Sequence, residues 1–211
     1  MISASKINTY LHCPKQYFFR YVQEMPFVPS EAMRLGSKVH GKIAKFDFEA
    51  DNTIEQHMLK NAKKFLDGMP ENPIMETTYE DKQNPGRFFG ELFGHRCIGI
   101  FDFHWPDCSI AGDWKTGKLD LRYTQSYDVQ AYILAELFKQ KYGKSLDKFY
   151  FKFLRDGGLY PARSIVESEL RDKTTDIILD ALIGIDANEY LKCKGPLCNW
   201  CDAKKLCDSC D

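Results

Sequence analysis

The 211-residue chain has no long apolar run and no excess of charge of either sign. No stretch approaches the roughly 18 consecutive apolar residues that a membrane span requires, so we expect no membrane partner. The 29 basic and 30 acidic residues nearly cancel, which means that a nucleic acid would have to be bound by local patches. The N-terminal segment lacks the basic, apolar and small-residue order of a secretory signal, and we expect a cytoplasmic protein.

The eight cysteines are not spread as in a secreted disulfide scaffold. Five of them lie between Cys193 and Cys210, within the last 19 residues. In a reducing compartment such clustering indicates metal ligation rather than disulfide bonds. The length fits one domain, residues 1–211, with a core large enough to fold without such ligation.

Periodicity and capping residues predict an α/β (α+β) fold with helices before and after a sheet. Between Ile74 and about Trp114 the hydrophobic period shortens towards two, with turn signals that favour three or four strands in hairpin order. Two further strands are expected at 149–154 and about 159–166. Helices are expected after Ser3 or Ser5, at 14–22, after Ser30, at 53–66, at about 123–142 and at about 170–190.

Two carboxylates and a lysine lie in neighbouring predicted strands. Alternation sends Asp113 and Lys115 to one face and Trp114 to the other. With a turn centred near Pro106 and Asp107, Asp102 would pair with about Ala111, which makes Asp113 its diagonal neighbour. Each residue alone has an ordinary explanation in turn or surface chemistry. Asp102, however, is flanked by two phenylalanines, where an unpaired charge would cost several kcal/mol.

Paired carboxylates of this kind suit Mg²⁺ or Mn²⁺, ions that activate water and polarise a phosphoryl oxygen. Lys115 could hold the same phosphate or orient the attacking water. His40, on an earlier predicted helix, is a candidate additional ligand. The interpretation that competes with this one is a structural histidine, since a single helical histidine is more often structural than ligating.

The C-terminal cysteines allow two metal centres. Cys198, Cys201, Cys207 and Cys210 form C-x2-C-x5-C-x2-C, which could hold zinc in a tetrahedral site. Alternatively, three C-terminal thiolates and the remote Cys13 could hold an iron-sulfur cluster that joins the two ends of the chain. Cys97 and Cys108, in the predicted sheet, are most simply small apolar core residues.

Taken together, the motifs resemble the PD-(D/E)xK nuclease superfamily, specifically its iron-sulfur RecB-like exonuclease branch, which includes the CRISPR-associated RecB-like exonuclease and the nuclease domain of AddB. The opening SASKINTYLHCPKQYFFRYV is similar to the N-terminal signature of that branch. GSKVH matches G-x3-H through Gly36 and His40, GIFD matches the strand of the first aspartate, and GDWKTGK matches (D/E)-x-K.

The resemblance implies a restriction-endonuclease-like core, a central mixed sheet flanked by helices, over residues 31–190. Residues 1–30 and 191–211 would form a clasp around a [4Fe-4S] cluster held by Cys13, Cys198, Cys201 and Cys207. The implied metal ligands are His40, Asp102, Asp113 and the Trp114 carbonyl. Lys115 would be catalytic, with Gln130 from a Q-x3-Y motif that departs from the family because the tyrosine is Tyr132 and Leu134 stands in its place.

These features predict a metal-dependent DNA exonuclease, acting on single strands, and the resemblance suggests 5′ to 3′ polarity. Recombination, replication or CRISPR-adaptation proteins are its expected partners. The alternatives are a catalytically idle module that holds DNA or an integrase-like protein, a zinc-stabilised nuclease, and a redox-active cluster protein. Basic and aromatic groups could follow the phosphates and stack on unpaired bases, with the candidates Lys6, Tyr10, Lys15, Tyr17, Arg20, Lys38 and Lys42.

Overall fold

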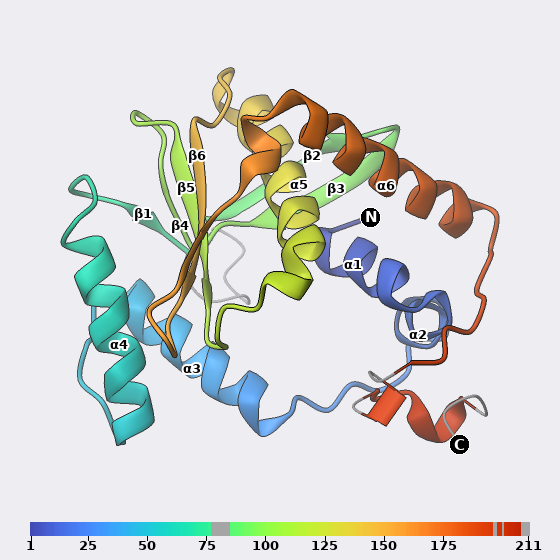
Figure 1. The fold of residues 1–211 in the computed structure, drawn as a ribbon, viewed down its shortest axis with the longest axis horizontal. Coiled ribbons are helices and arrows are strands. Elements are labelled where there is room, and N and C mark those ends of the chain that lie inside the picture. The colour runs from blue at the N-terminus through green and yellow to red at the C-terminus, as the bar shows by residue number, and fades with distance from the viewer. Residues whose placement is uncertain (77–84, 196–197, 200, 208–211) are drawn as a thin grey trace.

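A computed structural model describes residues 1–76, 85–195, 198–199 and 201–207. Cys210, the fourth cysteine of the predicted zinc motif, lies outside the described residues. Within them, a mixed sheet is flanked by helices on both faces (Figure 1), as the predicted α/β class requires.

The central sheet has the strand order β1-β4-β5-β6-β7 in the described part of the chain. The central pair, β5 and β6, is parallel, and every other neighbouring pair is antiparallel. The long helix between β5 and β6 provides the crossover that a parallel pair needs. The strands are β1 (Ile74–Met75), β4 (Phe103–Trp105), β5 (Ile110–Lys115), β6 (Lys148–Phe153) and β7 (Leu159–Pro161).

The predicted meander is wrong in one respect, because its strands belong to two sheets. β2 (Arg87–Leu92) and β3 (His95–Ile100) form a separate hairpin over α5 (Thr124–Tyr142), where the glycines Gly90 and Gly99 give close approach to Leu137. The chain bends at Asp102 between β3 and β4. The Asp102 carbonyl accepts from the Glu76 amide at 3.0 Å, which ties the bend to β1.

The N-terminal helices begin where the capping residues predict. Ser3 caps α1 (Ala4–His12), and Cys13 separates it from α2 (Pro14–Tyr17), which continues as a π-helical turn to Val22. Ser30 caps α3 (Glu31–Ala44), and Asn52 caps α4 (Thr53–Leu66). These caps work because a side-chain oxygen accepts from an otherwise unpaired amide of the first turn.

Two predicted elements end early. α6 (Ser168–Asp186) is shorter than predicted. The chain leaves the helical direction at Asn188, which has a positive φ of 57°. The last strand stops at Pro161 rather than at Val166, and a 3-10 turn follows. This turn packs on α5, where the Ser164 hydroxyl donates to the Asp128 carbonyl at 3.2 Å.

The sheet separates two apolar layers. α3 and α4 cover one face, where Val39, Ile43 and Met58 pack with Trp114. α5, α1 and α6 cover the other face, against the phenylalanines of β6. The predicted alternation of β5 is confirmed, since the Trp114 ring belongs to the α3 and α4 layer. Burial of each such large side chain contributes about 1.5–3 kcal/mol.

The middle of β5 leaves no room for a side chain at Gly112. A Cβ there would lie 2.4 Å from the Tyr150 carbonyl oxygen and 2.3 Å from the Phe103 ring. The two neighbouring strands therefore fix the backbone on which the next residue, Asp113, is placed.

The N-terminal and C-terminal segments lie side by side (Figure 1). The Lys15 amide donates to the Leu191 carbonyl at 3.2 Å, and Asp202 binds Gln16 at 2.8 Å and Arg20 at 2.6 Å. Phe19 packs with Ala203 and Cys207 in a small apolar cluster. These contacts join the two segments of the predicted clasp. Across the described helices, none is both long enough and apolar enough to cross a membrane.

Candidate active site

The site lies where the chain enters β4, next to β5. Phe103 pairs with Gly112, so Asp102 and Asp113 stand at directly opposite positions. The expected pairing of Asp102 with Ala111 is wrong, because Ala111 pairs with His104. The reason is the turn, in which four residues, 106–109, connect the paired Trp105 and Ile110, and Ser109 adopts a positive φ of 52°.

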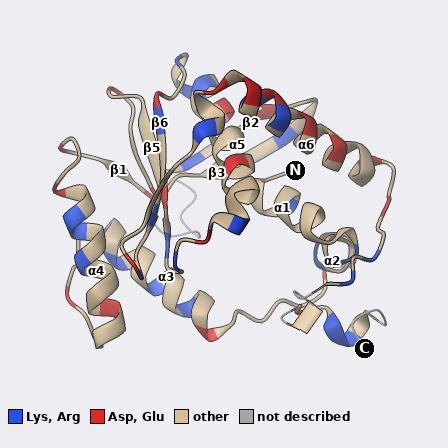
Figure 2. Ribbon diagram, in the orientation of Figure 1, with Lys and Arg blue, Asp and Glu red and all other residues tan. Residues whose placement is uncertain are grey.

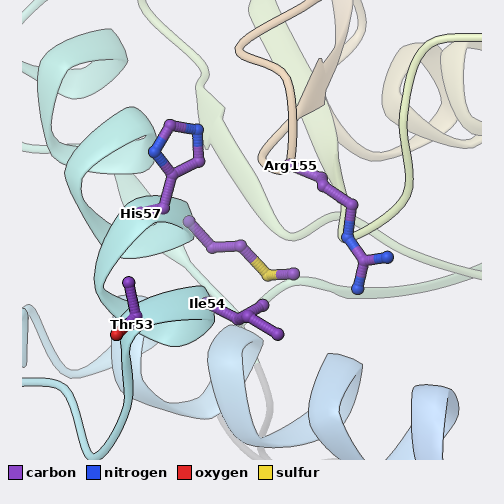
Figure 3. Close-up of a pocket in the computed structure, with 5 residues that line it drawn as sticks. Thr53, Ile54, His57 and Arg155 are labelled. Carbon is purple, nitrogen blue, oxygen red and sulfur yellow. The ribbon is translucent and has the colours of Figure 1, made fainter.

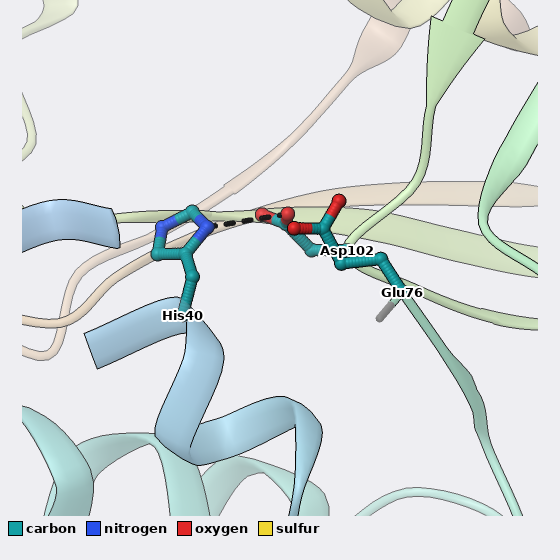
Figure 4. A group of neighbouring side chains, drawn as sticks. All are labelled: His40, Glu76 and Asp102. Carbon is teal, nitrogen blue, oxygen red and sulfur yellow. Dashed lines mark ion pairs between the residues drawn. The ribbon is translucent and has the colours of Figure 1, made fainter. Parts of the chain in front are cut away.

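Asp102 is buried, and its charge has the polar partners that we expect for a carboxylate between two apolar residues. Its exposure is 6%, and both flanking phenylalanines are fully buried. One carboxylate oxygen lies 3.2 Å from His40 Nδ1, and the other accepts from the Trp114 amide at 2.5 Å. His40, on α3, points toward the Asp102 carboxylate, and a dashed line marks their ion pair (Figure 4).

Glu76 is a candidate ligand that the sequence analysis missed. It follows β1 directly, and its carboxylate lies with His40 and Asp102 so that one ligand atom from each falls within 4.8 Å of the others (Figure 4). The sequence offered one signal for this role, because Glu76 is a carboxylate directly after a short apolar strand. The pairing of β1 with β4, which brings it to Asp102, is a long-range contact that local patterns do not reveal.

Asp113, Lys115 and Gln130 form a second, connected group. Lys115 Nζ lies 2.7 Å from Asp113 Oδ1 and donates to Gln130 Oε1 at 2.9 Å. The Gln130 amide donates to Asp113 Oδ2 at 2.6 Å. Gln130, on the second turn of α5, therefore orients both groups of the (D/E)-x-K strand.

Burial and mutual repulsion raise the pKa values of two carboxyls of the site, Glu76 and Asp113. Burial and the nearby Asp102 raise the pKa of Glu76 to about 8. Burial also raises the pKa of Asp113, although Lys115 opposes it. Burial disfavours charge on His40, but the Asp102 carboxylate outweighs it and raises the His40 pKa to about 9.

The donor set fits a hard divalent cation. Carboxylate oxygens and one imidazole are ligands that Mg²⁺ and Mn²⁺ accept, and a cation would relieve the repulsion that raises these pKa values. His40, Glu76 and Asp102 would hold the ion, with Asp113 beside them. The predicted ligation by the Trp114 carbonyl remains a prediction, although its amide is placed against Asp102.

A pocket of about 510 Å³ opens onto the carboxylates. Glu76, Asp102, Asp113 and Gln130 line it from the sheet and α5. The N-terminal segment lines it from the other direction, with Lys6 and Tyr21 among other residues. Leu134, which stands where the family has a tyrosine, also faces this pocket, whereas Tyr132 stacks on Phe93.

A second pocket, of about 370 Å³, lies at the start of α4 (Figure 3). Thr53, Ile54, His57, Met58 and Arg155 line it, and its surface is mostly apolar. None of the predicted site residues belongs to it, so the carboxylate pocket is the candidate active site.

The structure separates the predicted DNA-binding residues into groups. Tyr10 and Tyr17 are buried, at 8% and 7% exposure, which leaves neither ring free to stack on a base. Lys38 and Lys42 both pair with Glu55, at 2.7 and 3.2 Å.

The other predicted DNA-binding residues, Lys6, Lys15 and Arg20, differ in their surroundings. Lys6 lines the carboxylate pocket, and Lys15 lies over the Phe18 ring at 4.4 Å. Arg20 pairs with Asp202. Basic and acidic positions are interspersed over α3, α4 and α6 (Figure 2).

The described cysteines are unpaired by disulfides, and several lie close together. The Cys193 thiol shares a hydrogen bond with Cys13, and Cys198 Sγ lies 3.7 Å from the Cys193 carbonyl oxygen. Cys207 is buried beside Phe19. Cys97 is buried as predicted, but the expectation for Cys108 is wrong, because it lies exposed on the β4–β5 turn.

The mixed sheet, the opposed aspartates, the neighbouring lysine and the helical histidine fit the class of metal-dependent phosphodiester hydrolases. Residues 1–208 match the profile of the PD-(D/E)XK nuclease superfamily. The chain therefore belongs to this superfamily, whose members use divalent metals such as Mg²⁺ or Mn²⁺ and which implies DNA as the substrate. No curated protein is similar enough in sequence to count as a match.

The raised pKa values predict how the metal-free protein responds to pH. Glu76 and His40 both hold a proton more tightly in the folded state than in the unfolded state. Rising pH therefore favours unfolding, between about pH 4.5 and pH 8 through Glu76 and between pH 6.5 and about pH 9 through His40. In a chelator, the melting temperature is expected to fall from about pH 6 to about pH 9, and Mg²⁺ to reduce the fall.

Calorimetry across this range checks the expectation. Glu76→Gln should flatten the dependence, because its side chain no longer ionises, whereas Glu71→Gln, at an exposed neighbour, should leave it unchanged. A melting temperature that rises over the same range in the chelator would contradict the raised pKa values.

Proposed function

We propose that the protein is a metal-dependent deoxyribonuclease that degrades single-stranded DNA from its ends, in the 5′ to 3′ direction. The observation that carries this proposal is the joined set of Asp102, Asp113, Lys115 and Gln130, connected by the hydrogen bonds and ion pairs described above. A module that only holds DNA has no need for a lysine ion-paired to a buried carboxylate.

The side chains divide the chemistry of hydrolysis between them. His40, Glu76, Asp102 and Asp113 would hold Mg²⁺ or Mn²⁺, which supplies charge neutralisation at the scissile phosphate and lowers the pKa of water. Lys115, with its ammonium held by Asp113 and Gln130, is placed to orient the attacking water or to bind a phosphate oxygen. Gln130 acts as a positioning residue, because both of its hydrogen bonds go to protein groups.

The pocket supports a single-stranded substrate. Its wall at the N-terminal segment combines the Lys6 ammonium, 5.2 Å above the Tyr21 ring, with small residues of α1. A cation beside an aromatic ring is suited to a phosphate and an unpaired base. A duplex would have to open before its bases could use such a wall.

The same proposal includes a structural [4Fe-4S] cluster at the cysteines. Cys13, Cys198, Cys201 and Cys207 would hold it, and four thiolates are the usual donor set for this centre. The electrostatic influence of Cys13 on the Cys201 thiol, across the two chain ends, supports this assignment, and a zinc ion on the same thiols is its alternative. We further propose a cytoplasmic protein that works with recombination, replication or CRISPR-adaptation proteins.

Degradation of labelled DNA tests the activity. Anaerobically purified protein with Mg²⁺ or Mn²⁺ is expected to release label rapidly from 5′-labelled single strands and later from 3′-labelled ones. Circular single-stranded DNA, which has no ends, should survive, and a chelator should stop the reaction. Cleavage of the circle would indicate an endonuclease, and an intact linear substrate would favour a DNA-holding module.

A further inference from the structure

Cys13, Cys193 and Cys198 lie near one another where the two ends of the chain meet. The Cys193 thiol shares a hydrogen bond with Cys13, and the Cys193 carbonyl oxygen lies 3.7 Å from Cys198 Sγ. Cys193 lies outside the C-x2-C-x5-C spacing of the C-terminal motif. Its position beside Cys13 is therefore a feature of this chain that the motif does not explain.

The backbone holds Cys193 and Cys13 near each other. Cys13 is fixed at the junction of α1 and α2, where its amide donates to Thr9 at 2.9 Å and its carbonyl accepts from Tyr17 at 3.1 Å. Two residues after Cys13, the Lys15 amide binds the carbonyl of Leu191, two residues before Cys193. One backbone hydrogen bond thus aligns the two cysteine segments.

The backbone of residues 193–195 is also hydrogen bonded to the Cys198 sulfur. The Gly195 amide donates to Cys198 Sγ at 3.5 Å, and the Cys198 thiol donates to the Cys193 carbonyl at 3.7 Å. Amide donors to sulfur stabilise thiolates at iron-sulfur centres. Cys193 is exposed and lies in a connection without regular structure, so its side chain can change partners at low cost.

We propose that Cys193 is a fifth thiol of the cysteine centre and replaces Cys13 as a metal ligand when Cys13 is absent or displaced. This inference rests on the metal-binding cysteine centre in the proposed function. The exchange changes no oxidation state. The Cys193 thiol releases its proton to solvent as its sulfur binds the metal, and the displaced Cys13 sulfur takes up a proton as its bond to the metal breaks.

Metal analysis of the full chain tests the exchange. Cys13→Ala, Cys193→Ala and the double variant are purified anaerobically, and iron, zinc and acid-labile sulfide are measured together with visible absorbance. Each single variant is expected to keep at least about half of the wild-type metal, and the double variant to hold at least about tenfold less. Cys108→Ala, at an exposed thiol on the β4–β5 turn, is the matched control.

The outcomes distinguish failure of the exchange between Cys193 and Cys13 from failure of the proposed metal centre on which it rests. If Cys13→Ala alone loses as much metal as the double variant, Cys193 does not replace Cys13 and the inference is overturned. Full metal content in the double variant overturns it as well. If wild-type protein carries neither iron nor zinc, the proposed metal centre at the cysteines is wrong. The proposed nuclease activity is tested separately by the DNA degradation assay.

Alkylation gives a second readout. In metal-loaded Cys13→Ala protein, Cys193 is expected to resist iodoacetamide until a chelator removes the metal, as mass spectrometry can follow. Rapid alkylation of Cys193 with the metal retained would overturn the exchange. Cys13→Ser, which keeps the size of the side chain, is prepared alongside in case the alanine variant does not fold.

Discussion

Replacement of Lys115 by alanine is expected to reduce metal-dependent DNA hydrolysis by about a thousandfold. The ammonium contacts both Asp113 and Gln130 and lies in the partly buried site, where a fixed charge acts strongly on a developing oxyanion. The rate constant for release of label from single-stranded DNA, at saturating Mg²⁺, measures the loss. Binding of DNA should change far less than the rate.

A lysine elsewhere on the same sheet provides the control. Lys148 begins β6, pairs with Ile110 at the opposite end of β5 and is exposed, so Lys148→Ala should hydrolyse DNA at nearly the wild-type rate. If Lys115→Ala retained more than about a tenth of the activity, a role in transition-state stabilisation would be untenable.

Asp102→Asn is expected to have the second largest effect. The substitution keeps the size of the side chain and an oxygen for the Trp114 amide, but it removes the charge shared with His40 and Glu76. Metal affinity should fall at least about a hundredfold, and hydrolysis at a fixed low Mg²⁺ concentration on the order of a thousandfold. Titration calorimetry with Mn²⁺ reports the affinity directly.

The metal-free stability of this variant gives an independent check. Because the amide removes both the repulsion of Asp102 on Glu76 and Asp113 and its attraction to His40, the melting temperature in a chelator should change little. Asp107→Asn, on the exposed β4–β5 turn, should alter neither affinity nor stability. A destabilised Asp102→Asn protein with normal Mn²⁺ affinity would assign Asp102 a structural role only.

Local signals were sufficient to predict most helices and to select several residues that the structure brings together at the candidate site. Ser3, Ser30 and Gly143 mark helix ends through side-chain caps or a left-handed φ, which depend on a few neighbouring residues. Asp102 was identified because an apolar strand cannot bury a charge alone, and the structure supplies His40 and the Trp114 amide as its partners.

Features that depend on distant pairing were not predicted. Glu76 reaches the site only because β1 pairs with β4, and the strands of the expected meander separate at Asp102. The register of Asp102 and Asp113 depended on the length of one turn, and four residues were needed rather than two. Lys42 was predicted to bind a DNA phosphate, but its ammonium forms an ion pair with Glu55 on the next helix.

The junction between the chain ends affects when the catalytic pocket can be completed during synthesis. Lys6 and Tyr21 line the catalytic pocket, and the same N-terminal helices are held by Leu191, Asp202 and Ala203. These contacts span nearly the whole sequence, so they close late in folding. On the ribosome, the pocket wall can reach its final position only after residue 203 has emerged, so the pocket is not complete before that stage of translation.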